Sequence, residues 1–129
     1  MNPVVHFEIP YSNAKQLCDF YSFCFGWKLT PLGEASGNYI LAQTAVSDVK
    51  PGVPSGSIDG GLYPVKPEWP AQYPSIVIGV EDIQASMSKI TQRGGKVLGE
   101  PILIPNFGQY VAFTDPEGNR SSLIQPIGM

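Results

Sequence analysis

The sequence predicts an α+β fold in which two tandem βαβββ modules form a curled mixed sheet around a cleft. The order of one strand, one helix and three strands occurs twice, and the helix-stopping glycines Gly26 and Gly95 lie 69 residues apart. The predicted helix caps Asn13 and Asp82 are also 69 residues apart, so we interpret the repeat as an internal duplication. A ferredoxin-like α+β sandwich without a cleft is the alternative.

The first module is expected to cover residues 1–63, and its opening strand alternates apolar and polar side chains. His6 and Glu8 therefore share one strand face, which we expect to meet water. The predicted elements are a strand at 4–9, a helix capped by Ser12 or Asn13 and stopped by Gly26, and strands at 27–32, 38–43 and 60–63, with a Pro/Gly/Ser-rich stretch at 47–56.

The second module is expected to cover residues 75–129, after a linker at 64–74 whose prolines favour an extended chain. Its predicted elements are a strand at 75–80, a helix capped by Asp82 that ends at Gly94–Gly95, and strands at 96–98, 109–114 and 120–125. A tight hairpin turn at 115–119 should join the last two strands, and its flanking residues Glu117 and Arg120 are expected to be solvated.

Length and charge limit the classes of protein to consider. A chain of 129 residues with net charge −3 suits one compact domain, and it has no basic cluster to bind nucleic acid. No apolar run is long enough to span a membrane and no signal peptide is recognisable, so we expect a cytoplasmic protein. Cys18 and Cys24 fall on different faces of a predicted helix and are expected to be unpaired, small buried hydrophobic residues.

Several motifs occur in a recognisable order: His6 on the first strand, F-Y-x-x-x-F-G-W at 20–27, the glycine stop at 94–97, and D-P-E-G-N at 115–119. Together they resemble the vicinal-oxygen-chelate superfamily of glyoxalases, bleomycin-resistance proteins and dioxygenases. The resemblance spans nearly the whole chain. It implies the fold more strongly than the reaction, because the superfamily includes isomerases, epimerases, ring-cleaving dioxygenases, thiol transferases and drug-sequestering proteins.

In metal-dependent members the resemblance implies ligands on the first and last strands of each module. The matching positions here are His6, Ser75, Ser122 and a position near Gly60, which a shift of one residue would change to Asp59. Serine hydroxyls and glycine are poor ligands for zinc, nickel or iron, so we expect no cofactor and no tightly bound transition metal. A divalent metal at His6, the only histidine, is the alternative.

His6 and Glu8 are the candidate catalytic residues, as a hydrogen-bonded acid/base pair, with a merely structural role as the alternative. The candidate ligand-binding residues are Gly60, Ser75, Ser122, Trp69, Phe107 and Tyr110. Trp69 and Phe107 belong to a possible aromatic lip with Tyr63 and Tyr73, whose alternative is packing in a core or against a partner. Trp27 is expected to pack in the core, and Gly60 and Gly61 to allow a bend in their strand.

Three functions are compatible with these residues. The first is metal-free binding of a small organic molecule in the cleft, for sequestration or resistance. The second is a glyoxalase-type lyase or isomerase, or a dioxygenase-like enzyme, that uses His6 as a metal ligand or general base. The third is an interaction subunit that uses the aromatic, proline-rich linker. The resemblance also implies a homodimer.

Overall fold

The computed structural model describes residues 1–46 and 57–127, and it divides the chain into two compact units. The N-terminal unit is His6–Glu68, and the C-terminal unit combines Met1–Val5 with Trp69–Met129. The boundary falls inside the predicted linker, although the first five residues group with the second module. The Pro/Gly/Ser-rich stretch predicted at 47–56 lies outside the described residues.

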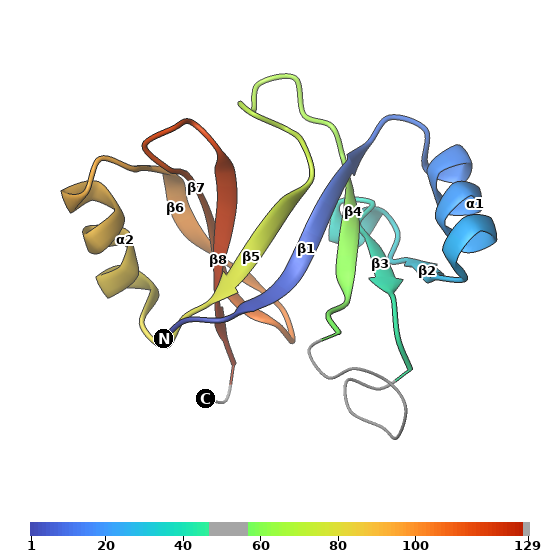
Figure 1. Ribbon diagram of the computed structural model, residues 1–129, viewed down its shortest axis with the longest axis horizontal. Helices are drawn as coiled ribbons and strands as arrows, with labels where there is room; N and C mark the ends of the chain where they lie inside the picture. The colour runs from blue at the N-terminus through green and yellow to red at the C-terminus, as the bar shows by residue number, and fades with distance from the viewer. Residues whose placement is uncertain (47–56, 128–129) are drawn as a thin grey trace. The chain divides into compact units, whose positions relative to one another are not determined.

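The N-terminal unit contains one helix and a four-stranded mixed sheet (Figure 1). Its elements are β1 (Val4–Tyr11), which begins just before the unit, α1 (Ala14–Phe25), β2 (Lys28–Pro31), a 3₁₀ turn (Glu34–Ser36), β3 (Ile40–Gln43) and β4 (Gly60–Pro64). β2 pairs antiparallel with β3, β3 antiparallel with β4, and β4 parallel with β1.

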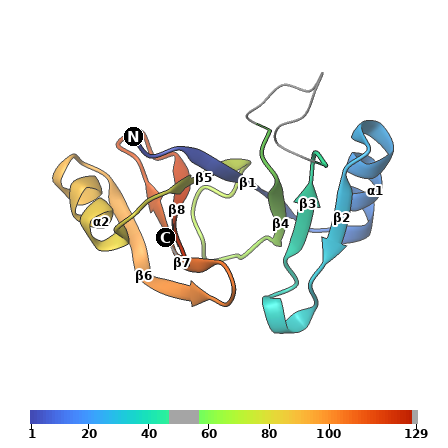
Figure 2. The ribbon, with the colours of Figure 1, turned by 90° about the horizontal axis from the view of Figure 1, so that it is seen from below.

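The C-terminal unit has the same topology. Its elements are β5 (Ser75–Gly79), α2 (Ile83–Gln92), β6 (Lys96–Ile104), β7 (Gly108–Thr114) and β8 (Arg120–Pro126). β6 pairs antiparallel with β7, β7 antiparallel with β8, and β8 parallel with β5. In each unit the helix packs beside its own sheet (Figure 2).

The repeated topology confirms the α+β class and the duplicated βαβββ order. The hairpin turn at 115–119 is also confirmed, because the backbone N–H of Asp115 donates to the carbonyl of Asn119. The strand predicted at 96–98 is longer than expected and continues to Ile104 after an irregularity in its pairing. Glycine and proline near residues 99–101 lowered the strand signal, but a bulge accommodates both.

The predicted caps position both helices. The side chain of Asn13 accepts a hydrogen bond from the backbone of Gln16, and Asp82 accepts one from Ala85. Gly26 ends α1 in the left-handed conformation, with φ of 72°, which a residue with a Cβ adopts only at a cost. Local chemistry therefore fixes where each helix begins and where α1 ends.

Each sheet packs one face against its helix. In the C-terminal unit, Val80, Ile83, Val111 and Leu123 form the buried cluster under α2. In the N-terminal unit, aromatic rings do the same work, since Trp27 stacks on Tyr21 of α1 at a centroid distance of 4.6 Å and lies 5.4 Å from Phe7. Trp27 thus belongs to the packing of its unit, as predicted.

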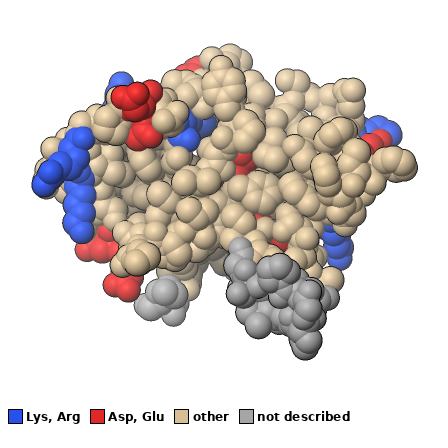
Figure 3. Space-filling view, in the orientation of Figure 1, with Lys and Arg blue, Asp and Glu red and all other residues tan. Residues whose placement is uncertain are grey.

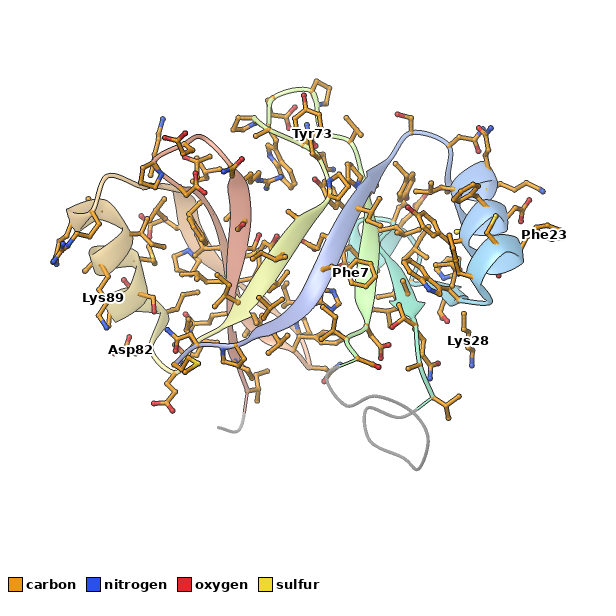
Figure 4. All side chains as sticks on the ribbon, in the orientation of Figure 1. Phe7, Phe23, Lys28, Tyr73, Asp82 and Lys89 are labelled. Carbon is orange, nitrogen blue, oxygen red and sulfur yellow. The ribbon has the colours of Figure 1, made fainter. Side chains whose placement is uncertain are left out.

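The outer side of α1 is unexpectedly apolar. Phe23 is 91% exposed and points away from the helix (Figure 4), and Phe20 and Phe25 are also exposed. Cys18 and Cys24 are both free thiols, as predicted, but the expectation that both are buried is wrong, because Cys24 is exposed and Cys18 is half-buried. The helix is apolar on more than one side, so spacing alone did not identify its buried face.

The charges on the face shown in Figure 3 are interspersed, and its described residues form no continuous basic patch. Within residues 1–46 and 57–127, neither helix has the length and hydropathy needed to cross a bilayer.

We predict that Ile83→Ala destabilises the protein strongly, because Ile83 is 1% exposed and its truncation leaves a cavity under α2. Such truncations cost about 2–5 kcal/mol, measured here by urea denaturation. Phe23→Ala is the control and should change the free energy of unfolding by less than about 1 kcal/mol. Equal losses for both variants would contradict this assignment of the core.

Candidate functional site

The two faces of the N-terminal sheet differ in chemistry. Phe7 faces the aromatic cluster of α1, so the alternation of β1 places His6 and Glu8 on the opposite face. β1 and β4 are in register at Glu8 and Gly61, which therefore lie side by side on that opposite face. The sequence prediction that His6 and Glu8 share a face is confirmed.

Tyr39, just before β3, connects these two side chains. Its hydroxyl donates to Oε2 of Glu8 at 2.8 Å and lies 2.9 Å from Nε2 of His6. The predicted pair is thus bridged by a phenol that comes from more than 30 residues away in the chain. His6, Tyr39 and Glu8 form what we call the relay.

The relay determines which nitrogen of His6 carries the proton. A phenol has one hydrogen, and Tyr39 gives it to Glu8, so the Tyr39 oxygen can only accept from His6. In the neutral imidazole the proton then lies on Nε2, and the lone pair is on Nδ1. The nitrogen available to a substrate or a metal ion is therefore Nδ1.

Burial changes the electrostatics of the relay. Desolvation lowers the pKa of His6 below its usual 6.5, and the negative charges of Glu8 and Asp59 oppose this only in part. His6 is therefore neutral at pH 7. The expectation that this strand face meets water is wrong, because Glu8 is only 8% exposed. The buried carboxylate of Glu8 needs a hydrogen-bond donor, and Tyr39 supplies one.

Gly61 makes room for the relay. A Cβ built on Gly61 would coincide with the hydroxyl of Tyr39, whereas one built on Gly60 would run into the ring of Phe7. Gly60, the position predicted first, thus faces the side of α1, whereas the alternative, Asp59, lies on the side of His6. Gly61 and Asp59 are the residues of this segment that share the His6 face, and Asp59 also accepts a hydrogen bond from the backbone of Thr44 at 2.8 Å.

In the C-terminal unit, Ser122 occupies the position equivalent to Gly61. It pairs with Val77 on β5, it is 2% exposed, and its hydroxyl lies 2.7 Å from that of Tyr110 on β7. Val111 follows Tyr110 and Leu123 follows Ser122, and both of these apolar residues belong to the core under α2. Since successive side chains of a strand alternate, Tyr110 and Ser122 lie on the sheet face opposite α2. Ser75 begins β5 and is half-buried.

The predicted aromatic lip is divided between the units. Tyr63 is buried in β4 of the N-terminal unit, whereas Trp69, Tyr73 and Phe107 belong to the C-terminal unit and are exposed in large part. Trp69 packs under the guanidinium group of Arg120, 4.7 Å from its ring centroid. The expectation that Arg120 is simply solvated is wrong, because its Nε is buried.

The donors at the ligand positions do not fit a tightly held transition metal. His6 uses Nε2 in the relay, Gly61 has no side chain, and Ser122 offers a neutral hydroxyl that is already hydrogen-bonded to Tyr110. Zinc, nickel and iron prefer several imidazole, thiolate or carboxylate ligands. No three such side chains converge within the described ranges 1–46 and 57–127.

Comparisons with known proteins establish the family. A model of the Glyoxalase/Bleomycin resistance protein/Dioxygenase superfamily matches residues 4–123. The chain belongs to this superfamily. A glyoxylase-like domain-containing protein of Didymella fabae is 30% identical over 119 residues, which cover 90% of this chain and 88% of that protein.

Two further proteins are similar to this chain, one in part of its sequence and one in its fold. A probable lactoylglutathione lyase of Synechocystis is 43% identical over 51 residues, 39% of each chain. A variant of Streptomyces coelicolor methylmalonyl-CoA epimerase, solved with 2-nitronate-propionyl-CoA, is similar with a TM-score of 0.69 at 19% identity. This likeness covers 100% of the chain and 97% of the epimerase, and it shows the superfamily fold.

Sequence reasoning missed Tyr39, the residue that links the two candidate catalytic side chains. Tyr39 follows a turn in which Asn38 has a positive φ of 56°, and its partners are on a distant strand. The signal available in the sequence was Gly61, since a glycine within a strand often marks the close approach of another group. That signal was interpreted as a bend.

We predict that ¹⁵N NMR of the imidazole detects the Nε2–H tautomer of His6 in the native protein. His6 is the only histidine, so its two ring nitrogens give unambiguous signals. Tyr39→Phe removes the phenol oxygen, and the two nitrogen shifts should then move toward each other as both tautomers become populated.

Tyr11→Phe is the matched control, because it removes a phenol of the same unit whose hydroxyl donates to the backbone of Asn38. It should leave both nitrogen shifts of His6 unchanged. Gly61→Ala should displace Tyr39 and reproduce the Tyr39→Phe spectrum. An Nδ1–H tautomer in the native protein, or a spectrum insensitive to Tyr39→Phe, would show that the relay does not control His6.

Proposed function

We propose that this superfamily member binds a small organic molecule beside the relay and does so without a tightly held transition metal. The observation that carries the proposal is the commitment of His6 Nε2 to Tyr39. The other positions matched to the ligands of metal-dependent members are serines and a glycine. A carbonyl or hydroxyl ligand could instead be held by hydrogen bonds, with Nδ1 of His6 as an acceptor or, once protonated, a donor. Metal-free binding of this kind would serve sequestration or resistance, as in the bleomycin-binding members of the superfamily.

A thermal-shift screen tests the metal-free state. Because a ligand that binds only the native state raises the melting temperature, a metalloprotein should respond to Zn²⁺, Ni²⁺, Fe²⁺ or a chelator. We expect no response to the metals or to the chelator, and a rise of several degrees with a bound organic compound. A melting temperature that rises with one metal in the native protein but not in His6→Ala would refute the proposal.

A second candidate function is a lyase or isomerase of the glyoxalase type, in which His6 is a general base. The relay favours it, because Tyr39 and Glu8 orient a neutral imidazole whose Nδ1 can take a proton from carbon next to a carbonyl group. Protonation leaves a positive ring whose Nε2–H still donates to Tyr39, and the negative charge of Glu8 favours that positive ring.

Proton exchange tests the base directly. Methylmalonyl-CoA is the ligand of a similar epimerase structure, and its α-hydrogen is a suitable probe for exchange with D₂O, followed by ¹H NMR. If His6 is a base, exchange is faster than in buffer and His6→Ala lowers it by about 10²-fold or more. Exchange catalysed equally by the native protein and by His6→Ala would eliminate His6 as the base for this probe.

We also propose that the protein is a cytoplasmic homodimer. The exposed aromatic side chains of α1 are the kind of surface that a second subunit covers, and two free cysteines suit a reducing compartment. Light scattering should give twice the chain mass of 14.0 kDa. A particle of the chain mass at micromolar concentration would be incompatible with the dimer.

A further inference from the structure

Arg120 is a half-buried cation of the C-terminal unit. It begins β8, and its guanidinium carbon lies 4.7 Å above the ring of Trp69. Its Nε is buried and has no hydrogen-bond partner in the described part of the chain. No carboxylate of residues 1–46 and 57–127 forms an ion pair with it, although acidic side chains outnumber basic ones by 11 to 8 in this chain.

This arrangement is unusual for an arginine that serves only the fold. Buried guanidinium groups are normally satisfied by a carboxylate or by several carbonyl groups, because desolvating the charge is costly. Stacking on Trp69 fixes the plane of the group and excludes water from one side, but it satisfies none of the N–H donors. Among the described residues, Nε is the nitrogen of Arg120 that is buried without a partner, and the side chain as a whole is half-buried.

The position of Arg120 on its strand determines which face of the sheet its side chain occupies. β8 is in register with β7 at Arg120 and Thr114, and Ser122 lies two residues further along the same strand. Strand alternation places Arg120 and Ser122 on one face, opposite the core that Leu123 forms with α2. The face that carries the candidate ligand residues of the C-terminal unit thus also carries a preoriented cation.

We propose that Arg120 and Trp69 form an anion-binding subsite within the C-terminal unit, which takes an organic anion through a carboxylate or phosphate group bound to the guanidinium. This inference goes beyond the proposed function, because the relay belongs to the other unit. The planar guanidinium matches the two oxygens of such a group, which pair with both outer nitrogens. Trp69, which is 42% exposed, offers the rest of the ligand an apolar surface beside the charge.

Arginine side-chain NMR tests the subsite with simple probes. Arg93 and Arg120 are the arginines of the chain, so ¹⁵N-arginine labelling gives two Nε–H signals, which Arg93→Lys assigns. The probes are benzoate and phenyl phosphate, with neutral benzamide as the matched compound, all at constant ionic strength. We expect the Arg120 signal to shift in a saturable way with the two anions and not with benzamide, while exposed Arg93 stays unchanged.

Two substitutions give the affinity. In a Trp27→Phe background, Trp69 is the only indole and its fluorescence reports binding of phenyl phosphate. Arg120→Gln should raise the Kd by about tenfold or more, and Arg120→Lys, which keeps the charge and guards against a folding defect, should raise it less. Arg93→Gln is the control and should leave the Kd unchanged.

The results separate this inference from the proposed function. Equal shifts of both arginine signals, or equal effects of benzoate and benzamide, would overturn the subsite. If the thermal-shift screen finds neutral ligands that leave the Arg120 signal in place, small-molecule binding stands and the anion subsite fails. Saturable binding of phenyl phosphate that depends on Arg120, in a protein that no compound of the screen stabilises, supports the subsite and counts against the wider function.

Discussion

The two-residue period of the β-strands constrains everything else in this molecule. Each sheet has one face covered by a helix, so apolar side chains must occupy every second position there, as Phe7 and Leu123 do. The positions between them are free to be polar, and they carry His6 and Glu8 in one unit and Ser122 in the other. Packing therefore leaves the sheet faces opposite the helices as the places where the polar candidate residues can lie.

Tyr39 shows how a polar residue becomes tolerable on such a face. A buried carboxylate without a donor is costly, and the phenol supplies that donor to Glu8 while it holds His6. As in other acid–base sites, a negative group orients a neutral imidazole, and here Glu8 does so through the hydroxyl of Tyr39.

Much of the fold could be predicted from the sequence, because helix caps, glycine stops and alternation are local signals. Asn13, Asp82 and Gly26 have their predicted roles for that reason. The relay could not be predicted, since the contact between His6 and Tyr39 depends on how β1, β4 and β3 are ordered in space. Arg120 was misjudged because its position beside a turn indicated solvent, whereas stacking on Trp69 depends on the path of the linker.

The contact between Gly61 and Tyr39 also limits how this protein can change over evolutionary time. A side chain at position 61 and the phenol at position 39 require the same volume. An acidic residue introduced at 61 alone would displace the tyrosine, and loss of the tyrosine alone would remove one hydrogen bond from the buried carboxylate of Glu8. The two positions are therefore coupled, so a substitution at one of them alone should lower the stability of the protein.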